Sequence, residues 1–413
     1  MEHVGTLKDG DFMTCLICSS HNSQMILNEE SFPYFTVPVA KKDKISILKK
    51  DKKESLFGEL CYWACKDCGH VQINKLPNKI IIDDLYEKYY TYPSPLKNTF
   101  EPLRDDYFVN YFKSSIDLLC RKQKLNSILE VGCYDGYILD CLKREGYETQ
   151  GCDPSEGAKI GQSFGLDIRR EYFCPDNFVK ENLYYDIVIS RHFIEHVFDP
   201  FQYLNDFGKV LKTKGLLIIE TPNVEHFLEK GLLEVFSLQH ISLFSEDSLS
   251  IALAKSGFEV ISVNKSTENL IMASTKSSKV EITKNINNRN LRKLFIETVN
   301  RNKSIINESI KDSIDFEKSI AIWGAGGFGI AALRLYNIPE RSIDYFIDSD
   351  PDKWKKEYIN TTIPIVSPSY AEDHPPSILI VASMYSKSIL ENLPTSFNKT
   401  KKLILTPHVA LIK

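Results

Sequence analysis

The chain has 413 residues, of which 43% are hydrophobic, and a formal net charge of -4 at pH 7. This length is enough for two or three domains, and the mixed, slightly acidic charge does not favour a nucleic-acid-binding surface. Because no apolar stretch reaches membrane-spanning length and the first residues do not resemble a signal peptide, we expect a cytoplasmic protein without membrane insertion, of an oligomeric state that the sequence does not set.

Two CxxC pairs lie in the first part of the chain, which we expect to be a zinc-binding module over residues 1–80. Each pair offers two thiolates from one tight turn, so that four sulfurs can surround a zinc ion and leave no position open for water. Free thiols or a redox pair are the alternatives, but a redox site needs only one CxxC. Cys61 is a bystander or an alternative ligand, and residues 32–57 look like an inserted hairpin. The expected ligands of a structural Zn²⁺ are Cys15, Cys18, Cys65 and Cys68.

A tyrosine-rich segment, residues 85–93, separates this module from the next predicted strand. Its aromatic rings can simply pack against the core. Alternatively, they form a lid that covers a cationic ligand by cation–π attraction and excludes water. Tyr89 and Tyr92 are the candidate lid residues, and both roles stay open.

Residues 129–136 read LEVGCYDG and follow the pattern of a buried strand that enters a glycine turn. A helix is expected to end near residues 140–146. About twenty residues after the glycines, Asp153 falls at the tip of the next predicted strand. An acidic side chain there can accept both hydroxyls of a ribose, although an ordinary helix N-cap is the alternative role.

The glycines are spaced GxxxG, and a strand carboxylate precedes them where it can face a cationic ligand. This combination resembles motif I of the class I methyltransferases that use S-adenosylmethionine (SAM). The resemblance implies a doubly wound, Rossmann-like α/β sheet that binds SAM outside the carboxyl ends of its strands. The implied cofactor residues are Glu130, Gly132, Asp135, Gly136, Asp153 and Pro154, with Tyr89 as a lid.

Further strands are predicted over residues 185–190 and 216–220, with a helix end and turn over 211–215. The intervening residues 191–200, RHFIEHVFDP, resemble the segment of the same superfamily that passes beside the methyl donor. This resemblance adds Ser190 and His192 to the expected cofactor contacts.

A loop over residues 236–245, FSLQHISLFS, precedes a helix that starts with an N-cap signature. His240 therefore lies over the expected cleft, where it is placed to act as a general base. A hydrogen-bonded anchor of the loop is the alternative. Residues 256–260 return the chain to a last sheet hairpin, so that the methyltransferase domain is expected over residues 81–275.

The carboxyl-terminal third begins with a helical linker over residues 276–318. Residues 319–329 then predict a strand and a GxGxxG turn that opens a helix, and a second strand ends at Asp348. This order resembles a dinucleotide-binding fingerprint. Because the remaining chain is short for a dehydrogenase, we expect residues 319–413 to form a Rossmann-like domain that holds substrate, rather than a nicotinamide enzyme.

The order of these motifs, over essentially the whole chain, resembles the three-domain, zinc-containing sugar C-methyltransferases. The resemblance implies that a nucleotide-linked ketosugar is methylated on carbon and that His240 removes the proton. The family pattern at the loop is a tyrosine, one residue and then Glu-His, whereas Ser237 and Gln239 stand at those positions here. Methylation of oxygen on another small molecule or glycan, and an idle scaffold that binds SAM and a nucleotide, are therefore alternatives.

Overall fold

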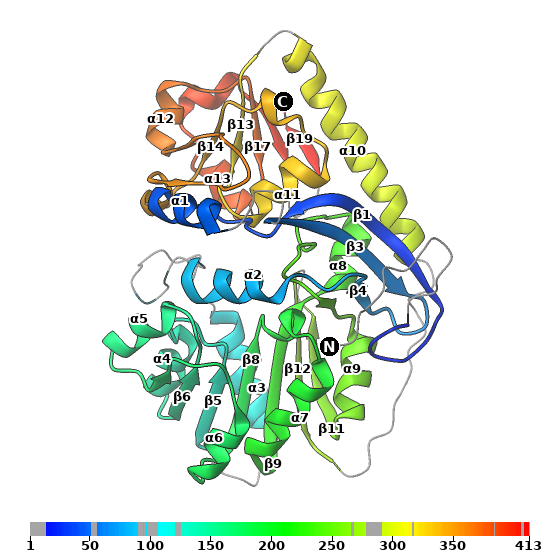
Figure 1. Cartoon of the computed structure of the whole chain (residues 1–413), viewed down its shortest axis with the longest axis vertical. Helices are drawn as coiled ribbons and strands as arrows, with labels where there is room; N and C mark the ends of the chain where they lie inside the picture. The colour runs from blue at the N-terminus through cyan, green and yellow to red at the C-terminus, as the bar shows by residue number, and fades with distance from the viewer. Residues whose placement is uncertain are drawn as a thin grey trace.

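The structure is a computed structural model, and it describes residues 14–50, 56–89, 94, 96, 106–119, 125–265, 268–277, 291–315, 318–383, 385–405 and 409–412. Figure 1 shows two α/β domains with the amino-terminal strands between them. Helix α10 (Leu291–Asp315) runs along one side and connects the two domains. The α/β class is confirmed, and α10 lies within the residues expected to form a helical linker.

The middle domain contains a seven-stranded sheet of order β11-β12-β9-β8-β5-β6-β7. The chain order reverses at the central strand β5, so the loops after β5 and β8 diverge at one edge of the sheet, where ligands of such sheets bind. Strands β11 and β12 close the other side as the expected antiparallel hairpin. The strands are β5 (Ser127–Val131), β6 (Glu148–Cys152), β7 (Ile168–Arg169), β8 (Tyr185–Arg191), β9 (Leu211–Pro222), β11 (Phe258–Lys265) and β12 (Asn269–Lys276).

Helices cover this sheet, and local sequence sets where two of them begin. Asp199 caps α7 by accepting a hydrogen bond from the Gln202 amide at 2.9 Å, and Pro200 occupies the first turn. Ser245 and Ser248 form a capping box at the start of α9. The helices are α3 (Asp106–Leu119), α4 (Tyr137–Arg144), α5 (Gly157–Ser163), α6 (Pro175–Lys180), η4 (Ile194–His196), α7 (Pro200–Val210), α8 (Val224–Lys230) and α9 (Glu246–Lys255).

The helix end expected over residues 211–215 is wrong, because β9 already begins at Leu211, which pairs with Tyr185. The register of this pairing shifts before Ile187, and Lys214 adopts a left-handed conformation with φ of 64°. The turn signal of this segment therefore marks an irregularity inside a strand rather than a helix end.

The amino-terminal module is a four-stranded sheet of order β1-β3-β4-β10. Its last strand, β10 (Ser242–Leu243), comes from the middle domain and pairs with β4. The insert does not form the expected hairpin, because residues 41–50 fold into helix α1. The elements are β1 (Ser23–Pro33), β2 (Val39–Ala40), α1 (Lys41–Lys50), β3 (Phe57–Cys65), β4 (Val71–Ile73), α2 (Lys79–Asp84) and the π-helix η2 (Leu85–Tyr89).

The carboxyl-terminal domain contains a six-stranded sheet of order β16-β14-β13-β17-β18-β19. Its strands are parallel except for β19 at the edge. The expected strand, glycine turn and helix correspond to β13, residues 324–326 and α11. The elements are β13 (Ile320–Trp323), α11 (Gly327–Leu335), β14 (Tyr345–Ile347), β15 (Lys356–Glu357), β16 (Ile365–Val366), α12 (Pro368–Asp373), β17 (Ile378–Val381), α13 (Ser386–Glu391), β18 (Lys401–Ile404) and β19 (Ala410–Ile412), with short 3₁₀ turns over Glu340–Ser342, Pro351–Lys353 and Thr395–Lys399.

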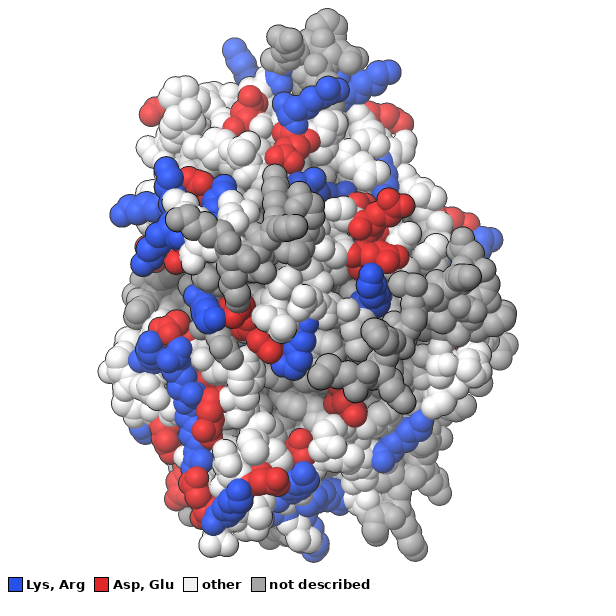
Figure 2. Space-filling model, in the orientation of Figure 1, with Lys and Arg blue, Asp and Glu red and all other residues white. Residues whose placement is uncertain are grey.

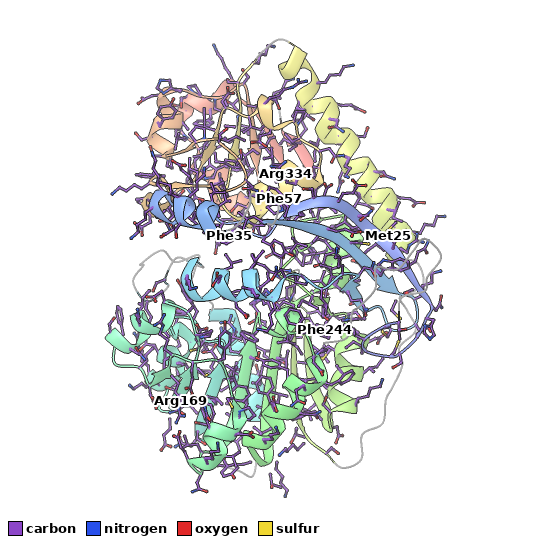
Figure 3. All side chains as sticks on the ribbon, viewed as in Figure 1. Met25, Phe35, Phe57, Arg169, Phe244 and Arg334 are labelled. Atoms are coloured by element: carbon purple, nitrogen blue, oxygen red, sulfur yellow. The ribbon has the colours of Figure 1, made fainter. Side chains whose placement is uncertain are left out.

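One hydrophobic core joins the amino-terminal module, helices α8 and α10, and the carboxyl-terminal domain. Phe35 and Phe57 belong to this core or pack against it, and they lie where the amino-terminal strands meet the carboxyl-terminal domain (Figure 3). Strand β2 also pairs with β15, and Lys44 forms an ion pair with Glu357 at 3.0 Å. The amino-terminal module is thus attached to both neighbours.

The surface carries charges of both signs. In Figure 2, lysine and arginine side chains alternate with aspartate and glutamate over the visible face, without a continuous basic band among the described residues. Within the described parts of the chain, no helix has the length and apolar character needed to cross a membrane.

Candidate functional site

The four predicted zinc ligands come together in the structure. Cys15 Sγ lies 3.6 Å from Cys68 Sγ, and Cys18 Sγ lies 3.5 Å from Cys65 Sγ. All four sulfurs lie within 4.8 Å of one another. Zn–S bonds of about 2.3 Å in a tetrahedron separate the sulfurs by about 3.8 Å, so the arrangement fits a four-thiolate zinc ion. Such a site has no open position, and its role would be structural.

The zinc module is joined to the loop that carries His240. Strand β4 follows directly on the second CxxC pair and pairs with β10, with Gln72 opposite Ser242. The Ile73 amide donates to the Ile241 carbonyl at 3.0 Å, and the Ser245 hydroxyl donates to the Cys68 carbonyl at 2.9 Å. The backbone that follows His240 is therefore fixed by the zinc module, in part by Cys68, which is a predicted zinc ligand.

The glycine turn after β5 is built as the sequence predicts. Gly132 and Gly136 have φ of 77° and 76°, where a side chain is strained, and a Cβ at Gly132 would lie 2.7 Å from the Phe193 ring. Asp153 follows β6, and its carboxylate accepts the Tyr134 amide at 2.9 Å and the Ser155 amide at 2.9 Å. The same carboxylate that is expected to hold a ribose thus also orders the glycine turn.

Glu130 places a buried carboxylate beside this turn. Its side chain is buried in β5, and Oε2 has no hydrogen-bond partner among the described residues. Burial raises the pKa of Glu130 to about 8, against the lowering effect of Arg191. An ammonium group such as that of SAM would satisfy this oxygen and favour its ionised form, so the residues present fit the cofactor.

Two other predicted cofactor residues already have protein partners. Asp135 accepts hydrogen bonds from the Ser94 hydroxyl at 2.5 Å and from the Leu96 and Tyr137 amides at 3.1 and 3.0 Å, so it ties the preceding chain to the glycine turn. Ser190 is fully buried, with its hydroxyl 3.1 Å from that of Tyr203.

Pro154 follows Asp153 at the start of the connection to α5 and is partly buried. The side chain of Tyr89 and the whole of Tyr92 lie outside the described residues.

Replacing Asp153 by alanine is expected to weaken SAM binding about tenfold to a hundredfold, because hydrogen bonds to charged groups contribute roughly 1.5–3 kcal/mol. Titration calorimetry would measure the affinity, and circular dichroism would verify the fold. Asp140→Ala is the matched control, since Asp140 pairs with Arg144 on the outer face of α4. Undiminished affinity in Asp153→Ala would exclude Asp153 from the cofactor site.

Histidines and carboxylates gather after β8, beside the His240 loop. His192, strained at φ of 47°, places its ring 3.6 Å from a Glu195 oxygen and 3.7 Å from a Glu220 oxygen. The rings of His196 and His240 lie 4.8 Å apart between centroids. This cluster stands at the carboxyl ends of β8 and β9, at the same edge of the sheet as the glycine turn.

The two inner histidines have fixed tautomers. The Nδ1 of His240 lies 2.5 Å from the Val235 carbonyl, and the Nδ1 of His196 lies 2.8 Å from the Gln239 carbonyl. A carbonyl oxygen only accepts, so in each neutral ring the proton sits on Nδ1 and Nε2 is a bare acceptor. Burial lowers the pKa of His240 to about 4, with a further contribution from His196, and burial also lowers the pKa of His196.

Residues of the amino-terminal module hold this loop from the other side. The Tyr86 hydroxyl, from η2, lies 2.9 Å from His196 Nδ1 and donates to Gln239 Oε1 at 3.1 Å. The Tyr62 hydroxyl, from β3, donates to the Ser237 carbonyl at 2.7 Å and also contacts the His240 carbonyl.

Sequence reasoning did not place Tyr62, Tyr86, Glu195 or His196 among the site residues. The Glu-His pair directly after a predicted strand was a usable signal for the last two. No local pattern marks Tyr62, which is one aromatic residue in a buried strand.

The glycine turn of the carboxyl-terminal domain faces the amino-terminal module. A Cβ at Gly326 would have nothing within 4 Å, so the backbone here is open to a ligand, whereas one at Gly327 would lie 3.6 Å from the Thr36 hydroxyl. Asp348 accepts the Ala325 amide at 2.9 Å and pairs with Lys353 at 2.9 Å. Like Asp153, Asp348 orders its own glycine turn, but its carboxylate is also neutralised by Lys353.

Two protein-family models match this chain. Residues 106–263 match the model of a methyltransferase domain, and residues 260–407 match that of a C-methyltransferase C-terminal domain. The middle of the chain is therefore a methyltransferase domain, as the sequence predicts, which supports SAM as its cofactor and a SAM-dependent methyltransferase as its enzyme class.

Two curated relatives each match less than a third of the chain. The ubiquinone biosynthesis O-methyltransferase of Ruegeria sp. (strain TM1040) is 30% identical over 133 residues, which are 30% of this chain and 53% of that protein. The protein of the same description from Ruegeria pomeroyi (strain ATCC 700808 / DSM 15171 / DSS-3) is 32% identical over 101 residues, 23% of this chain and 41% of that protein. The chain thus spans about half the length of these relatives.

Similar solved structures also cover less than half of the chain. The plantazolicin methyltransferase BpumL in complex with SAH has a TM-score of 0.35 at 16% identity, and it covers 45% of this chain and 91% of that chain. A SAM-dependent methyltransferase from Archaeoglobus fulgidus has a TM-score of 0.31 at 18% identity, and it covers 43% of this chain and 100% of that chain.

Proposed function

We propose that this protein transfers a methyl group from SAM to a carbon of a nucleotide-linked ketosugar, with His240 as the general base. The observation that carries the proposal is the pair of neutral imidazoles, His196 and His240, whose bare Nε2 atoms stand at the edge of the sheet that holds the glycine turn. The match of residues 260–407 to a C-methyltransferase C-terminal domain supports carbon as the acceptor.

The short link between the His240 loop and the glycine turn at Gly327 supports a substrate with a nucleotide at one end. The Tyr34 carbonyl accepts a hydrogen bond at 3.2 Å from the side-chain amide of Gln239, the residue next to His240. Two residues later, Thr36 lies beside Gly327 at the start of α11, and two extended residues span about 7 Å. A phosphate at the amino end of α11 would thus belong to a molecule that can reach His240.

The proposed reaction has two parts, proton removal from the substrate and methyl transfer to the resulting carbanion. His240 Nε2 takes a proton from a carbon next to the ketone, and the C–H electron pair enters the enolate. The enolate carbon forms the new C–C bond while the S–CH₃ bond breaks, and S-adenosylhomocysteine leaves. The cofactor supplies an electrophilic methyl group, and this chain supplies the base, the alignment of the two reactants and a site closed to water.

The experiment is incubation of the protein with SAM and a panel of nucleotide-linked 4-ketosugars, followed by mass spectrometry of the products. We expect a mass increase of one methylene and, by NMR, a methyl group on carbon. Absence of transfer to every ketosugar, with transfer to a hydroxylated acceptor instead, would contradict the proposal.

Methylation of oxygen is the second candidate. It is favoured by the curated relatives, which carry the description of ubiquinone biosynthesis O-methyltransferases. His240 would then remove a hydroxyl proton rather than a carbon-bound one. The position of the new methyl group in the product distinguishes the two candidates.

A further inference from the structure

A carboxylate lies behind the two inner imidazoles without reaching the surface. Glu195 is 1% exposed, and it offers an oxygen within 4.8 Å of ring nitrogens of both His196 and His240. Its Oε2 accepts the Thr221 hydroxyl at 3.0 Å, which fixes the carboxylate in place. Glu195 is therefore close enough to act on the histidines and too deeply buried to touch a substrate.

Two buried carboxylates face two cationic groups in this cluster. Glu195 and Glu220 are both buried, and Arg191 is paired with Glu220 at 2.5 Å. Glu195 is left to His192, whose pKa is raised against the effect of burial by Glu195 and Glu220, and to the two neutral imidazoles of His196 and His240. Burial alone would raise the pKa of Glu195, but its contact with His192 holds that pKa below its usual value, so the carboxylate is ionised at neutral pH.

The geometry of the loop determines which ring nitrogen can receive a proton from the substrate. His240 and His196 use their Nδ1 protons on the carbonyls of Val235 and Gln239. A proton taken from substrate can therefore reside only on Nε2, and the ring that accepts it becomes an imidazolium in a buried environment. A nearby negative charge lowers the cost of that imidazolium.

We propose that Glu195 is the counter-charge of the catalytic base, a positioning residue that stabilises the imidazolium formed when His240 removes the substrate proton. This inference rests on the proposed function, because it concerns the same proton transfer. The proton moves from substrate to Nε2 of His240, its bonding pair stays with the substrate, and Glu195 itself remains ionised throughout.

The backbone of Glu195 has a separate role that a side-chain change leaves intact. The Ile241 amide donates to the Glu195 carbonyl at 2.7 Å, and this bond holds the His240 loop against η4. Glutamine at position 195 keeps this bond and can still accept from Thr221. Glu195→Gln therefore removes the charge while it retains the shape of the site.

The test compares Glu195→Gln with Thr221→Val and with Glu225→Gln. Glu225 is the matched control, since its carboxylate pairs with Lys265 at 3.1 Å on the outside of α8. The measurements are kcat and KM for methyl transfer, SAM affinity by calorimetry, and exchange of the substrate α-proton into deuterium oxide in the presence of S-adenosylhomocysteine. The last of these isolates the proton-transfer step.

For Glu195→Gln we expect kcat and the exchange rate to fall roughly tenfold to a thousandfold, less than the loss of about 10²–10⁴ for removal of the base itself, with SAM affinity unchanged within about threefold. Thr221→Val should show a smaller loss of the same kind, and Glu225→Gln no loss. NMR of labelled histidines should show a lower pKa for His240 in Glu195→Gln. A structural role alone would change KM or the fold instead.

Two results would overturn the inference. One is an exchange rate in Glu195→Gln equal to that of an active wild type. The other is loss of wild-type activity on mild chelation, restored by a divalent cation that Glu195→Gln no longer binds, which would make the cluster a metal site. A wild type without any exchange or methyl transfer refutes the proposed function itself, so the two failures are distinguishable.

Discussion

Substitution of Cys65 by serine is expected to release zinc and to lower the melting temperature by about 10 °C or more. Binding of structural zinc contributes about 10 kcal/mol or more to small zinc domains, and 1 kcal/mol corresponds to roughly 4–8 °C in a domain of 60–100 residues. The sulfur of Cys65 lies 3.5 Å from that of Cys18, so its loss leaves three ligands. Metal analysis and calorimetric melting measure the two effects.

The control for this prediction is Cys61→Ala. Cys61 is buried in the same strand, β3, but it is not among the four clustered sulfurs. Its replacement removes a small buried side chain, which costs about 1 kcal/mol, and should leave one zinc ion per chain. Equal melting temperatures for Cys65→Ser and Cys61→Ala, with no zinc in either the variants or the wild type, would refute the metal site.

His240→Ala should reduce methyl transfer by a factor of about 100 to 10,000, because it removes the base and leaves the cofactor site untouched. SAM affinity should change by less than about threefold. His374→Ala is the control, since His374 stacks on Tyr370 in the carboxyl-terminal domain. Full turnover in His240→Ala would leave the histidine only a role as loop anchor.

The rate of methyl transfer is expected to fall at acid pH. Because burial lowers the pKa of His240 to about 4, the imidazole is neutral from pH 8 down to about pH 5. It gains a proton only as the pH falls further. The rate limited by this base should therefore stay level across neutral pH and decline on the acid side, and rate profiles of kcat/KM would show it.

Much of the middle domain can be predicted from the sequence, because its central strands are short apolar runs that end in polar or glycine residues. Residues 127–131 and 185–190 become β5 and most of β8, and Asp153 falls directly after β6. The zinc ligands can be predicted equally well, since a CxxC turn determines its own geometry. These features depend on neighbours within a few residues.

The features that could not be predicted depend on distant partners. Strand β10 has two residues, and only its pairing with β4, some 170 residues earlier, makes it a strand. Lys41–Lys50 mixes lysines with apolar residues in a way that suits a hairpin as well as the helix that it forms. Tyr86 and Glu195 become site residues through contacts with the loop at 237–241. Such contacts leave no periodic pattern in the sequence.

The shared sheet β1-β3-β4-β10 has a consequence for the independence of the domains. A methyltransferase domain cut free of residues 1–80 would keep its seven-stranded sheet but would expose the edge of β10 and the buried Leu243 and Phe244 beside it. It would also lose the Tyr62 hydroxyl that holds the His240 loop. The catalytic unit of this protein is therefore larger than its cofactor-binding fold. Its amino-terminal module can be replaced only by one that also supplies a strand to pair with β10.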